Sequence, residues 1–311
     1  MKKVLVIGSL NCDYVINLPK MPETGETLLC GGYELVPGGK GANQAYALGK
    51  LGGSAAMLGA VGGDGPGAKL LENLRSVGVD VSGIKTVTGV STGTAFIFVD
   101  SSGSNSIIVA QGANLQVDEE YIRENDRLLR ECDIVLLQLE IPIETVLYAA
   151  KRAKELGKTV ILDPAPARPD LPRELYRWVD YIKPNEVELG MLLGDSEAQN
   201  SLDESTAILQ GWGVKNVVVT LGEKGAFLRE ENGLTRAFPP VSGLRVVDTT
   251  AAGDSFTAAL AYGLSAGSGL HEALELAICV SGLAVTKKGA QTSIPDMAEV
   301  RAYMQAHNKK L

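Results

Sequence analysis

The segment Asp248-Thr-Thr-Ala-Ala-Gly-Asp254 places a carboxylate and a run of small residues before an apolar-periodic helix expected to begin near Phe256. Small residues leave backbone N–H groups open to an anion, and the helix dipole favours negative charge there. Asp254 could then take a proton from a hydroxyl nucleophile during phosphoryl transfer. A lone Asp before a helix is more often an N-cap, bonding the N–H of Phe256 or Thr257. The run Ala251-Ala252-Gly253 favours the catalytic interpretation, because a cap needs no such run.

Glycines gather in Pro37-Gly38-Gly39-Lys40-Gly41-Ala42-Asn43-Gln44-Ala45, at the start of a helix expected to end near Leu51. Unencumbered N–H groups at a helix start bind the oxygens of a polar ligand. The spacing is equally compatible with glycines that only turn the chain. A P-loop would need Gly at Glu34 and Ser or Thr at Gly41, and no Gly-x-Gly-x-x-Gly follows the first expected strand, so neither common nucleotide motif is formed.

Asn185 and Glu188 stand three residues apart before the apolar stretch 189–193, which is the spacing of a capping box at a helix start. An amide and a carboxylate there could also hold a hydrated Mg²⁺ beside phosphates, because this ion keeps most of its waters. Both roles can hold at once. The turn from Thr220 to Gly225 ends the expected strand 217–221, at the end of open α/β sheets where ligands bind.

Polar side chains also follow the ends of two expected strands. Asn11 and Asp13 lie two residues apart after the first strand, so they share one side of an extended chain. Glu140 follows the buried strand expected over 134–139. Amide and carboxylate groups in this arrangement suit sugar hydroxyls, although ordinary solvent-facing strand ends fit each residue equally well.

The composition limits the classes of function. The 311 residues include 37 acidic and 29 basic side chains, a formal net charge of −8, and 45% are apolar. This indicates a soluble globular protein and argues against a nucleic-acid partner or an acidic membrane surface. Four cysteines without a Cys-x-x-Cys pair argue against zinc and disulfides, which fits a cytoplasmic protein. No stretch approaches the apolar length needed to span a membrane.

The elements that must position these residues follow an α/β pattern. From residue 134 onward, buried runs alternate with helical periodicity, which predicts a mainly parallel sheet covered on both faces. Segments 94–99 and 106–109 flank residues 100–104 like a hairpin, and 14–18 and 27–36 could complete a small separate sheet. We expect a Rossmann-like three-layer αβα body over 1–12, 38–92 and 112–311, with a small β-sheet lid over 13–37 and 93–111.

The motifs taken together resemble the ribokinase-like carbohydrate kinases, from Gly8-Ser-Leu-Asn-Cys-Asp13 to Gly289-Ala-Gln-Thr-Ser-Ile-Pro295. Both signatures of that family are present, in residues 38–43 and 248–254. The resemblance implies transfer of the γ-phosphoryl group of ATP to the primary hydroxyl of a pentose, giving D-ribose 5-phosphate. It also implies Mg²⁺ and an activating K⁺.

The resemblance assigns roles residue by residue. Asp254 would be the general base, and the N–H groups of Ala251, Ala252 and Gly253 would form the anion hole. The residues similar to the family's sugar site are Asn11, Asp13, Gly38, Gly39, Lys40, Asn43 and Glu140, with Ala95, Ile97 and Val109 of the lid closing over the sugar. The residues that match the ATP site are Asn185, Glu188, Thr220, Gly222, Gly225 and Gly253, of which Asn185 and Glu188 would lie near magnesium. The residues that match the monovalent cation site are Asp248, Thr250, Ala284, Gly289 and Ser293.

Two departures from the family pattern leave the sugar open. Asp163 stands where Asn is common, and Cys12 lies between the two sugar-contact candidates. Kinases for 2-deoxyribose, fructose or a nucleoside are therefore alternatives. A nucleotide-dependent oxidoreductase and a non-catalytic sugar sensor are alternatives from other classes. We also expect a homodimer formed through the lid, because an isolated small sheet exposes its edges and one face.

Overall fold

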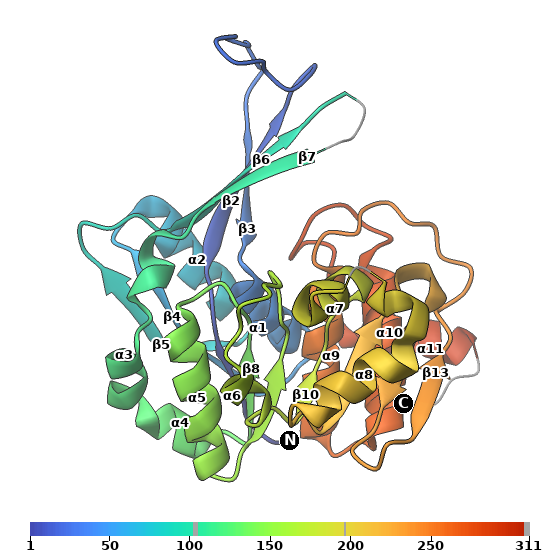
Figure 1. Ribbon diagram of the computed structural model, residues 1–311. Helices are drawn as coiled ribbons and strands as arrows, with labels where there is room; N and C mark the ends of the chain where they lie inside the picture. Colours follow the sequence, from blue (N-terminus) through green and yellow to red (C-terminus); the bar gives the residue numbers. More distant parts are fainter. Residues whose placement is uncertain (102–104, 196, 308–311) are drawn as a thin grey trace.

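A large sheet forms the centre of the protein in the computed structural model, which describes residues 1–101, 105–195 and 197–307 (Figure 1). Its strands in chain order are β1 (Val4–Ile7), β4 (Ala55–Gly62), β5 (Asp80–Val87), β8 (Ile134–Leu137), β9 (Thr159–Leu162), β10 (Tyr181–Ile182), β11 (Asn216–Thr220), β12 (Ala226–Arg229) and β13 (Thr235–Phe238). Their spatial order is β13-β12-β11-β10-β9-β8-β1-β4-β5. Neighbouring strands pair in parallel from β11 to β5, whereas β12 and β13 add antiparallel pairs at one edge.

Helices cover both faces of this sheet (Figure 1). The α-helices are α1 (Lys40–Lys50), α2 (Gly65–Ser76), α3 (Glu119–Glu124), α4 (Asp126–Glu131), α5 (Ile143–Glu155), α6 (Arg173–Tyr176), α7 (Glu186–Leu193), α8 (Leu202–Gly211), α9 (Ala252–Ala266), α10 (Leu270–Ala284) and α11 (Met297–Ala306). Short 3₁₀ turns lie at η1 (Gly112–Gln116), η2 (Ala198–Ser201) and η3 (Gly222–Lys224). Within the described residues, none of the helices has the length and apolar character needed to cross a membrane.

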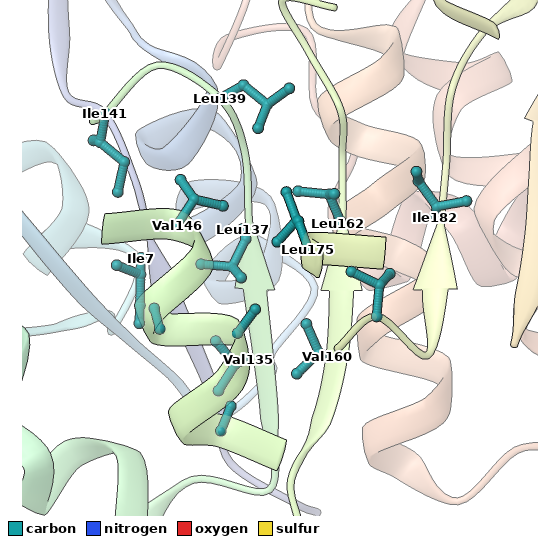
Figure 2. Close-up of a cluster of buried hydrophobic side chains, with 14 of the residues drawn as sticks. Ile7, Val135, Leu137, Leu139, Ile141, Val146, Val160, Leu162, Leu175 and Ile182 are labelled. Atoms are coloured by element: carbon teal, nitrogen blue, oxygen red, sulfur yellow. The ribbon is translucent and has the colours of Figure 1, made fainter. Parts of the chain in front are cut away.

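Alternate residues of the central strands pack against opposite helical layers. On β8, Val135 and Leu137 lie with Val146 of α5 in one buried cluster (Figure 2), whereas Leu136 lies with Leu48 of α1 in the cluster on the other face. Successive strand side chains point to opposite faces, so a strand that is apolar throughout requires cover on both sides. The three-layer αβα body expected from the sequence is confirmed.

A smaller sheet projects from the body (Figure 1). Among the described residues its strands lie in the order β3 (Glu34–Gly38), β2 (Asn11–Asn17), β6 (Gly93–Val99) and β7 (Asn105–Ala110). The hairpin expected from residues 94–99 and 106–109 is confirmed by β6 and β7, while residues 102–104 of its loop lie outside the described residues. The strand expected over 27–36 is wrong in extent, because pairing with β2 begins only at Glu34.

The junction between the two sheets brings the polar motifs together. β2 begins at Asn11, shortly after β1 ends, and Asn11 pairs with Gly38 at the end of β3. α1 begins two residues later, at Lys40. The start of α1 therefore lies at the carboxyl end of the parallel strands, which is where open α/β sheets bind their ligands.

Candidate active site

Asp254 lies in the first turn of α9 and is buried, with 6% of its surface exposed. The helix begins at Ala252 with Ala251 as its N-cap residue, so the alternative that Asp254 caps the helix is wrong. The carboxylate instead accepts two hydrogen bonds from α1, from Asn43 Nδ2 to Oδ2 (2.9 Å) and from Gln44 Nε2 to Oδ1 (3.1 Å). The two signature segments, far apart in sequence, therefore meet at this carboxylate.

The backbone before Asp254 is strained. Ala251 has φ 58° and ψ 12°, in the left-handed region, and no other non-glycine residue in the described ranges has a positive φ. Such a conformation costs energy for a residue with a side chain, and strain of this kind concentrates at functional sites. The Ala252 N–H donates to the Thr249 carbonyl at 3.2 Å, a long bond, and the first N–H groups of a helix have no acceptor within it. This turn can therefore bind an anion.

The charged groups around Asp254 shift its pKa in opposite directions. Burial raises the pKa of Asp254 to about 6; the positive charge of Lys40 works against this rise and the negative charge of Asp163 adds to it. Burial would lower the pKa of the Lys40 ammonium, but the surrounding carboxylates, which include Glu140 and Glu188, together raise it. An ammonium whose pKa is raised by nearby carboxylates thus lies in the same buried region as a carboxylate whose pKa suits a general base.

Asn11 and Asp13 approach the glycine-rich segment closely. A Cβ added to Gly38 would lie 2.1 Å from Asp13 Oδ2, and one added to Gly39 would lie 2.7 Å from the Asn11 nitrogen. Gly39 also has φ 86°, which favours glycine. The Asp13 Oδ1 atom is buried and has no hydrogen-bond partner among the described residues. A buried carboxylate oxygen of this kind is suited to accept a hydrogen bond from a ligand hydroxyl.

Glu140 lies at the same junction. Its Oε2 atom accepts hydrogen bonds from Ser9 Oγ at 2.5 Å and from the Lys40 backbone nitrogen at 3.0 Å. Burial raises the pKa of Asp13 to about 7, and the nearby Glu140 charge adds to the rise. The structure therefore brings these two carboxylates and the start of α1 together.

The three lid residues share one face of the small sheet. Ala95 of β6 lies opposite Asp13, and Val109 of β7 lies opposite Ala95. Ile97 is two residues further along β6 and so points to the same side. Ala95 is buried, whereas 48% of the Val109 surface is exposed. An apolar surface thus adjoins the carboxylate expected to contact the sugar.

A cleft of about 680 Å³ includes Asp254 and Lys40 in its lining. The residues expected to bind ATP line it, and they are Asn185 and Glu188 at the start of α7, Thr220, Gly222, Gly225 and Gly253. Ala251 and Ala252 of the expected anion hole line it as well. Asn185 and Glu188 form the predicted capping box, in which each side chain accepts from the other's backbone nitrogen, at 2.8 Å and 2.7 Å. Asn185 also forms a parallel bridge with Thr220, so the two nucleotide motifs are neighbours.

The far part of the cleft is apolar and was not predicted from the sequence. Its lining includes Val241, Leu244 and Val246 from the segment before α9, and Ile278 and Val285 from α10 and its end. A flat aromatic base suits such a wall, since ligand pockets are mostly apolar with a few placed polar groups. The signal available in the sequence was the presence of apolar residues in the segment before α9, which has neither helical nor strand periodicity.

The two loops expected to hold a monovalent cation are joined by Asp248. Its Oδ1 atom accepts from the Thr250 nitrogen at 2.9 Å, and its Oδ2 atom accepts from the Gly289 nitrogen at 2.8 Å. Ala284 ends the helix that leads into the second loop, and Ser293 is buried at the end of that loop. The expected residues therefore lie on two connected loops beside the start of α9.

Several buried amides at the site were missed by sequence reasoning. Gln138 Nε2 donates to Gln44 Oε1 at 2.6 Å, and Gln291 Nε2 donates to Asn43 Oδ1 at 3.0 Å. Asn114 Nδ2 donates to Asn11 Oδ1 at 2.8 Å. These residues orient the amides that contact Asp254 or the expected sugar. Their spacing in the sequence carries no motif, so only the fold reveals them.

Comparisons with known proteins show the family to which the chain belongs. The model of the pfkB family carbohydrate kinases matches residues 1–297. The chain belongs to this family of carbohydrate kinases. The kinase is 38% identical over 305 residues to a ribokinase of Haemophilus influenzae, covering 98% of this chain and 99% of the relative. It is 34% identical over 302 residues to a deoxyribokinase of Salmonella typhi, covering 97% and 98%.

A solved structure shows the same fold as this kinase. The structure of Arabidopsis thaliana ribokinase complexed with ribose and ATP superposes with a TM-score of 0.92 at 35% sequence identity, covering 98% of this chain and 99% of that one. The family resemblance inferred from the two signatures is confirmed. Membership of a kinase family does not support the nucleotide-dependent oxidoreductase considered as an alternative.

Proposed function

We propose that this kinase transfers the γ-phosphoryl group of ATP to the 5-hydroxyl of D-ribose and releases D-ribose 5-phosphate and ADP. The observation that carries the proposal is the buried carboxylate of Asp254, held by Asn43 and Gln44 at the start of α9, in the lining of the cleft. The similarity to ribokinases, one of them described in complex with ribose and ATP, supports both substrates.

In the proposed reaction, Asp254 takes the proton of the ribose 5-hydroxyl as its oxygen attacks the γ-phosphorus. The bond from that phosphorus to the bridging oxygen of ADP breaks, and ADP leaves with its electron pair. The N–H groups of Ala251, Ala252 and Gly253 stabilise the negative charge on the phosphoryl oxygens. The Lys40 ammonium adds positive charge to the same region. Asn11, Asp13 and the lid hold the sugar.

We assign magnesium and the nucleotide to the part of the cleft lined by α7 and the turn from Thr220 to Gly225. Asn185 and Glu188 line the cleft, and an amide with a carboxylate suits the water shell of a magnesium ion. A magnesium ion held there would supply positive charge to offset the negative charge of the phosphates. Thr220, Gly222 and Gly225 would hold the nucleotide. A Cβ at Gly225 would lie 2.0 Å from the Phe238 carbonyl oxygen, so this turn requires glycine.

Potassium is expected to raise turnover. A monovalent ion between the loops of Asp248 and Gly289 would fix the start of α9, because Asp248 already joins those loops. We expect kcat of enzyme dialysed free of potassium to rise about tenfold on adding K⁺, an effect typical of improved positioning. Sodium and lithium at the same ionic strength are the controls. Equal rates with all three ions would contradict the cation assignment.

The fall of kcat/KM at low pH, called the acid limb below, should report the protonation of Asp254. Because its pKa is raised to about 6, the base is protonated below that pH and cannot accept the hydroxyl proton. Besides burial, the pKa of Asp254 is affected by the charges of Lys40, Asp163 and Lys183 and by the hydrogen bond from Asn43, and the Asp13 carboxylate also interacts with it. We expect kcat/KM for ATP, measured at saturating ribose, to fall about tenfold per unit below about pH 6. A rate that stays constant down to pH 4.5 would be inconsistent with this base.

The substrate can be identified by measuring ADP release from Mg-ATP with D-ribose, 2-deoxyribose, fructose and a nucleoside as candidate acceptors. Selective turnover of D-ribose is the expected result. The similarity to a deoxyribokinase makes 2-deoxyribose the sharpest comparison, because the two sugars differ by one hydroxyl. Higher kcat/KM for another sugar in this panel would keep the phosphoryl transfer and replace the substrate.

The small sheet is expected to mediate a homodimer. Ile107 and Ile108 are adjacent on β7, point to opposite faces, and have 53% and 61% of their surfaces exposed. Exposed apolar faces of this kind mark association sites. Sedimentation velocity at micromolar concentration should show a dimer, and I107D or I108D should dissociate it, which identifies the face involved. A monomeric wild type, or a dimer that persists in both variants, would contradict this interface.

A further inference from the structure

Asp163 lines the same cleft as the catalytic base and the proposed anion hole, although the proposed reaction assigns it no part. It is the first residue after β9 and is 1% exposed. It lines the cleft together with Gly253 and Asp254. A carboxylate this buried needs compensating partners, and its two oxygens contact different groups.

One oxygen pairs with Lys183. The Lys183 ammonium is 3.1 Å from Asp163 Oδ1, and the side chains of the pair are 4% and 2% exposed. A Cβ added to Gly253 would lie 3.3 Å from Lys183 Nζ, so the ammonium lies against the proposed anion hole. Asp163 Oδ1 accepts no hydrogen bond within the described residues, so this contact is an ion pair that does not use up the three N–H donors of the ammonium. Lys183 is therefore placed to contact a phosphoryl oxygen bound there.

The other oxygen engages Gln44. Gln44 Nε2 donates to Asp163 Oδ2 at 2.9 Å and to Asp254 Oδ1 at 3.1 Å, which uses both hydrogens of the amide. Gln138 binds the Gln44 carbonyl oxygen at 2.6 Å and so fixes which way the amide faces. The Thr257 hydroxyl also lies 2.9 Å from Asp163 Oδ2. The amide is thus held in one orientation against the base.

We propose that Asp163 is a positioning residue: one of its carboxylate oxygens holds the Lys183 ammonium at the anion hole, and the other holds the Gln44 amide against the catalytic base. The proposal rests on the proposed function, because it assumes phosphoryl transfer at Asp254. An asparagine at this position would not balance the charge of Lys183, and because its amide has one oxygen, its NH₂ group would face either Lys183 or Gln44. Asp163 and Lys183 therefore act as a pair in this chain.

The test measures kcat and the acid limb of kcat/KM for ATP at saturating sugar in D163N, K183M and the double variant. We expect D163N to lower kcat about 10- to 100-fold, since two groups at the reacting centre lose their orientation. The negative charge of Asp163 raises the pKa of Asp254 and the positive charge of Lys183 lowers it. The acid limb should therefore move to lower pH in D163N and to higher pH in K183M. The effects on kcat should be strongly non-additive in the double variant.

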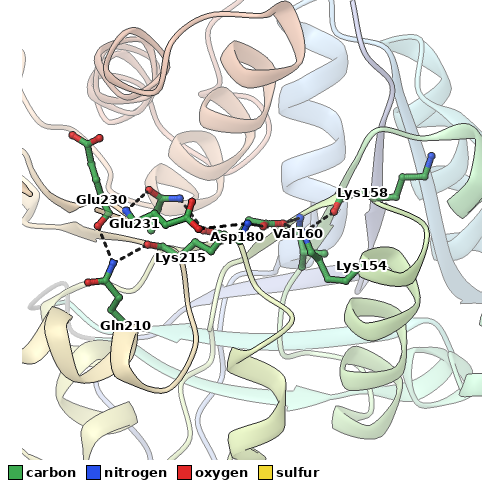
Figure 3. Close-up of polar contacts among 9 residues, drawn as sticks. Lys154, Lys158, Val160, Asp180, Gln210, Lys215, Glu230 and Glu231 are labelled. Atoms are coloured by element: carbon green, nitrogen blue, oxygen red, sulfur yellow. Dashed lines mark hydrogen bonds and ion pairs between the residues drawn. The ribbon is translucent and has the colours of Figure 1, made fainter. Parts of the chain in front are cut away.

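Asp180 provides a matched control directly before β10, the strand that pairs with β9. It binds the Val160 nitrogen at the amino end of β9 at 2.8 Å and pairs with Lys154 at 2.6 Å (Figure 3). It is also buried, with 7% of its surface exposed. Asp180 does not line the cleft and lies at the opposite end of β10 from Lys183, so we expect D180N to lower thermal stability and to leave kcat and the acid limb unchanged.

The outcomes separate this inference from the proposed function. The wild type is assayed first across the sugar panel, and the variants are then assayed with the sugar that is turned over, so a different sugar revises only the substrate. A kcat in D163N within twofold of wild type, or limbs that move in the same direction in D163N and K183M, would overturn the positioning role. If D163N does not fold, K183M is sufficient for the test: an acid limb at the wild-type pH in K183M would overturn the positioning role. A wild type that phosphorylates none of the sugars would overturn both proposals.

Discussion

Replacing Asp254 by asparagine is expected to lower kcat about 10³- to 10⁴-fold while ribose still binds. The variant has no base for the hydroxyl proton, and its amide must face either the Asn43 or the Gln44 amide that donates to the native carboxylate. One unfavourable donor pair costs about 1–3 kcal/mol. The loss of a buried charge offsets part of that cost, so the fold should be retained. Steady-state kinetics and calorimetric ribose binding measure the two effects separately.

Asp296 is the control for this substitution because it has the structural role that Asp254 lacks. It is the N-cap of α11 and accepts from the Glu299 nitrogen at 2.9 Å. Asparagine is an equally good cap, so D296N should leave both kcat and stability nearly unchanged. A kcat for D254N close to that of D296N would mean that Asp254 is not the base.

Replacing Asp13 by asparagine is expected to raise KM for ribose about 100-fold, because hydrogen bonds to a charged group are worth roughly 1.5–3 kcal/mol each. The Asp13 Oδ1 atom has no partner among the described residues, and the carboxylate occupies the space that a side chain at position 38 would fill. The bound sugar is expected to supply the missing donor. Steady-state kinetics with varied ribose at saturating ATP give the value.

The pH dependence of ribose binding offers a second measurement on Asp13. Burial and the Glu140 charge raise the pKa of Asp13 to about 7, and its charged form is the better acceptor. KM for ribose should therefore rise as the pH falls below about 7 in the wild type, and this dependence should be absent in D13N. KM for ATP is the internal control and should change little. If KM for ribose in D13N is within threefold of the wild-type value, Asp13 does not belong to the sugar site.

The sequence predicted the fold where patterns are local. The strands β8, β9 and β11 are short apolar runs, and burial on both faces requires that pattern. The strand expected over 27–36 was too long, because the apolar and β-branched residues before Glu34 match a strand locally but find no neighbour with which to pair. Pairing partners are set by tertiary structure, which propensity does not contain.

The site was predictable only where it coincides with contiguous motifs. Asp254 and the glycines at 38 and 39 stand out because small residues allow close approach of the backbone. Gln44 occurs in the same glycine-rich segment, but its role depends on contacts with Asp163 and Asp254, which are remote in the sequence. Asp163 stands out as a departure from the family pattern, yet only its distance to Lys183 explains it.

The most direct test of the central claim is the identity of the phosphorylated product. After complete turnover of D-ribose with Mg-ATP and potassium, the ³¹P spectrum with proton coupling should show one new phosphate ester split by the two protons of carbon 5. That pattern identifies D-ribose 5-phosphate and places the transfer at the primary hydroxyl. A doublet from the anomeric proton, or inorganic phosphate alone, would contradict phosphoryl transfer from ATP to the 5-hydroxyl at this site.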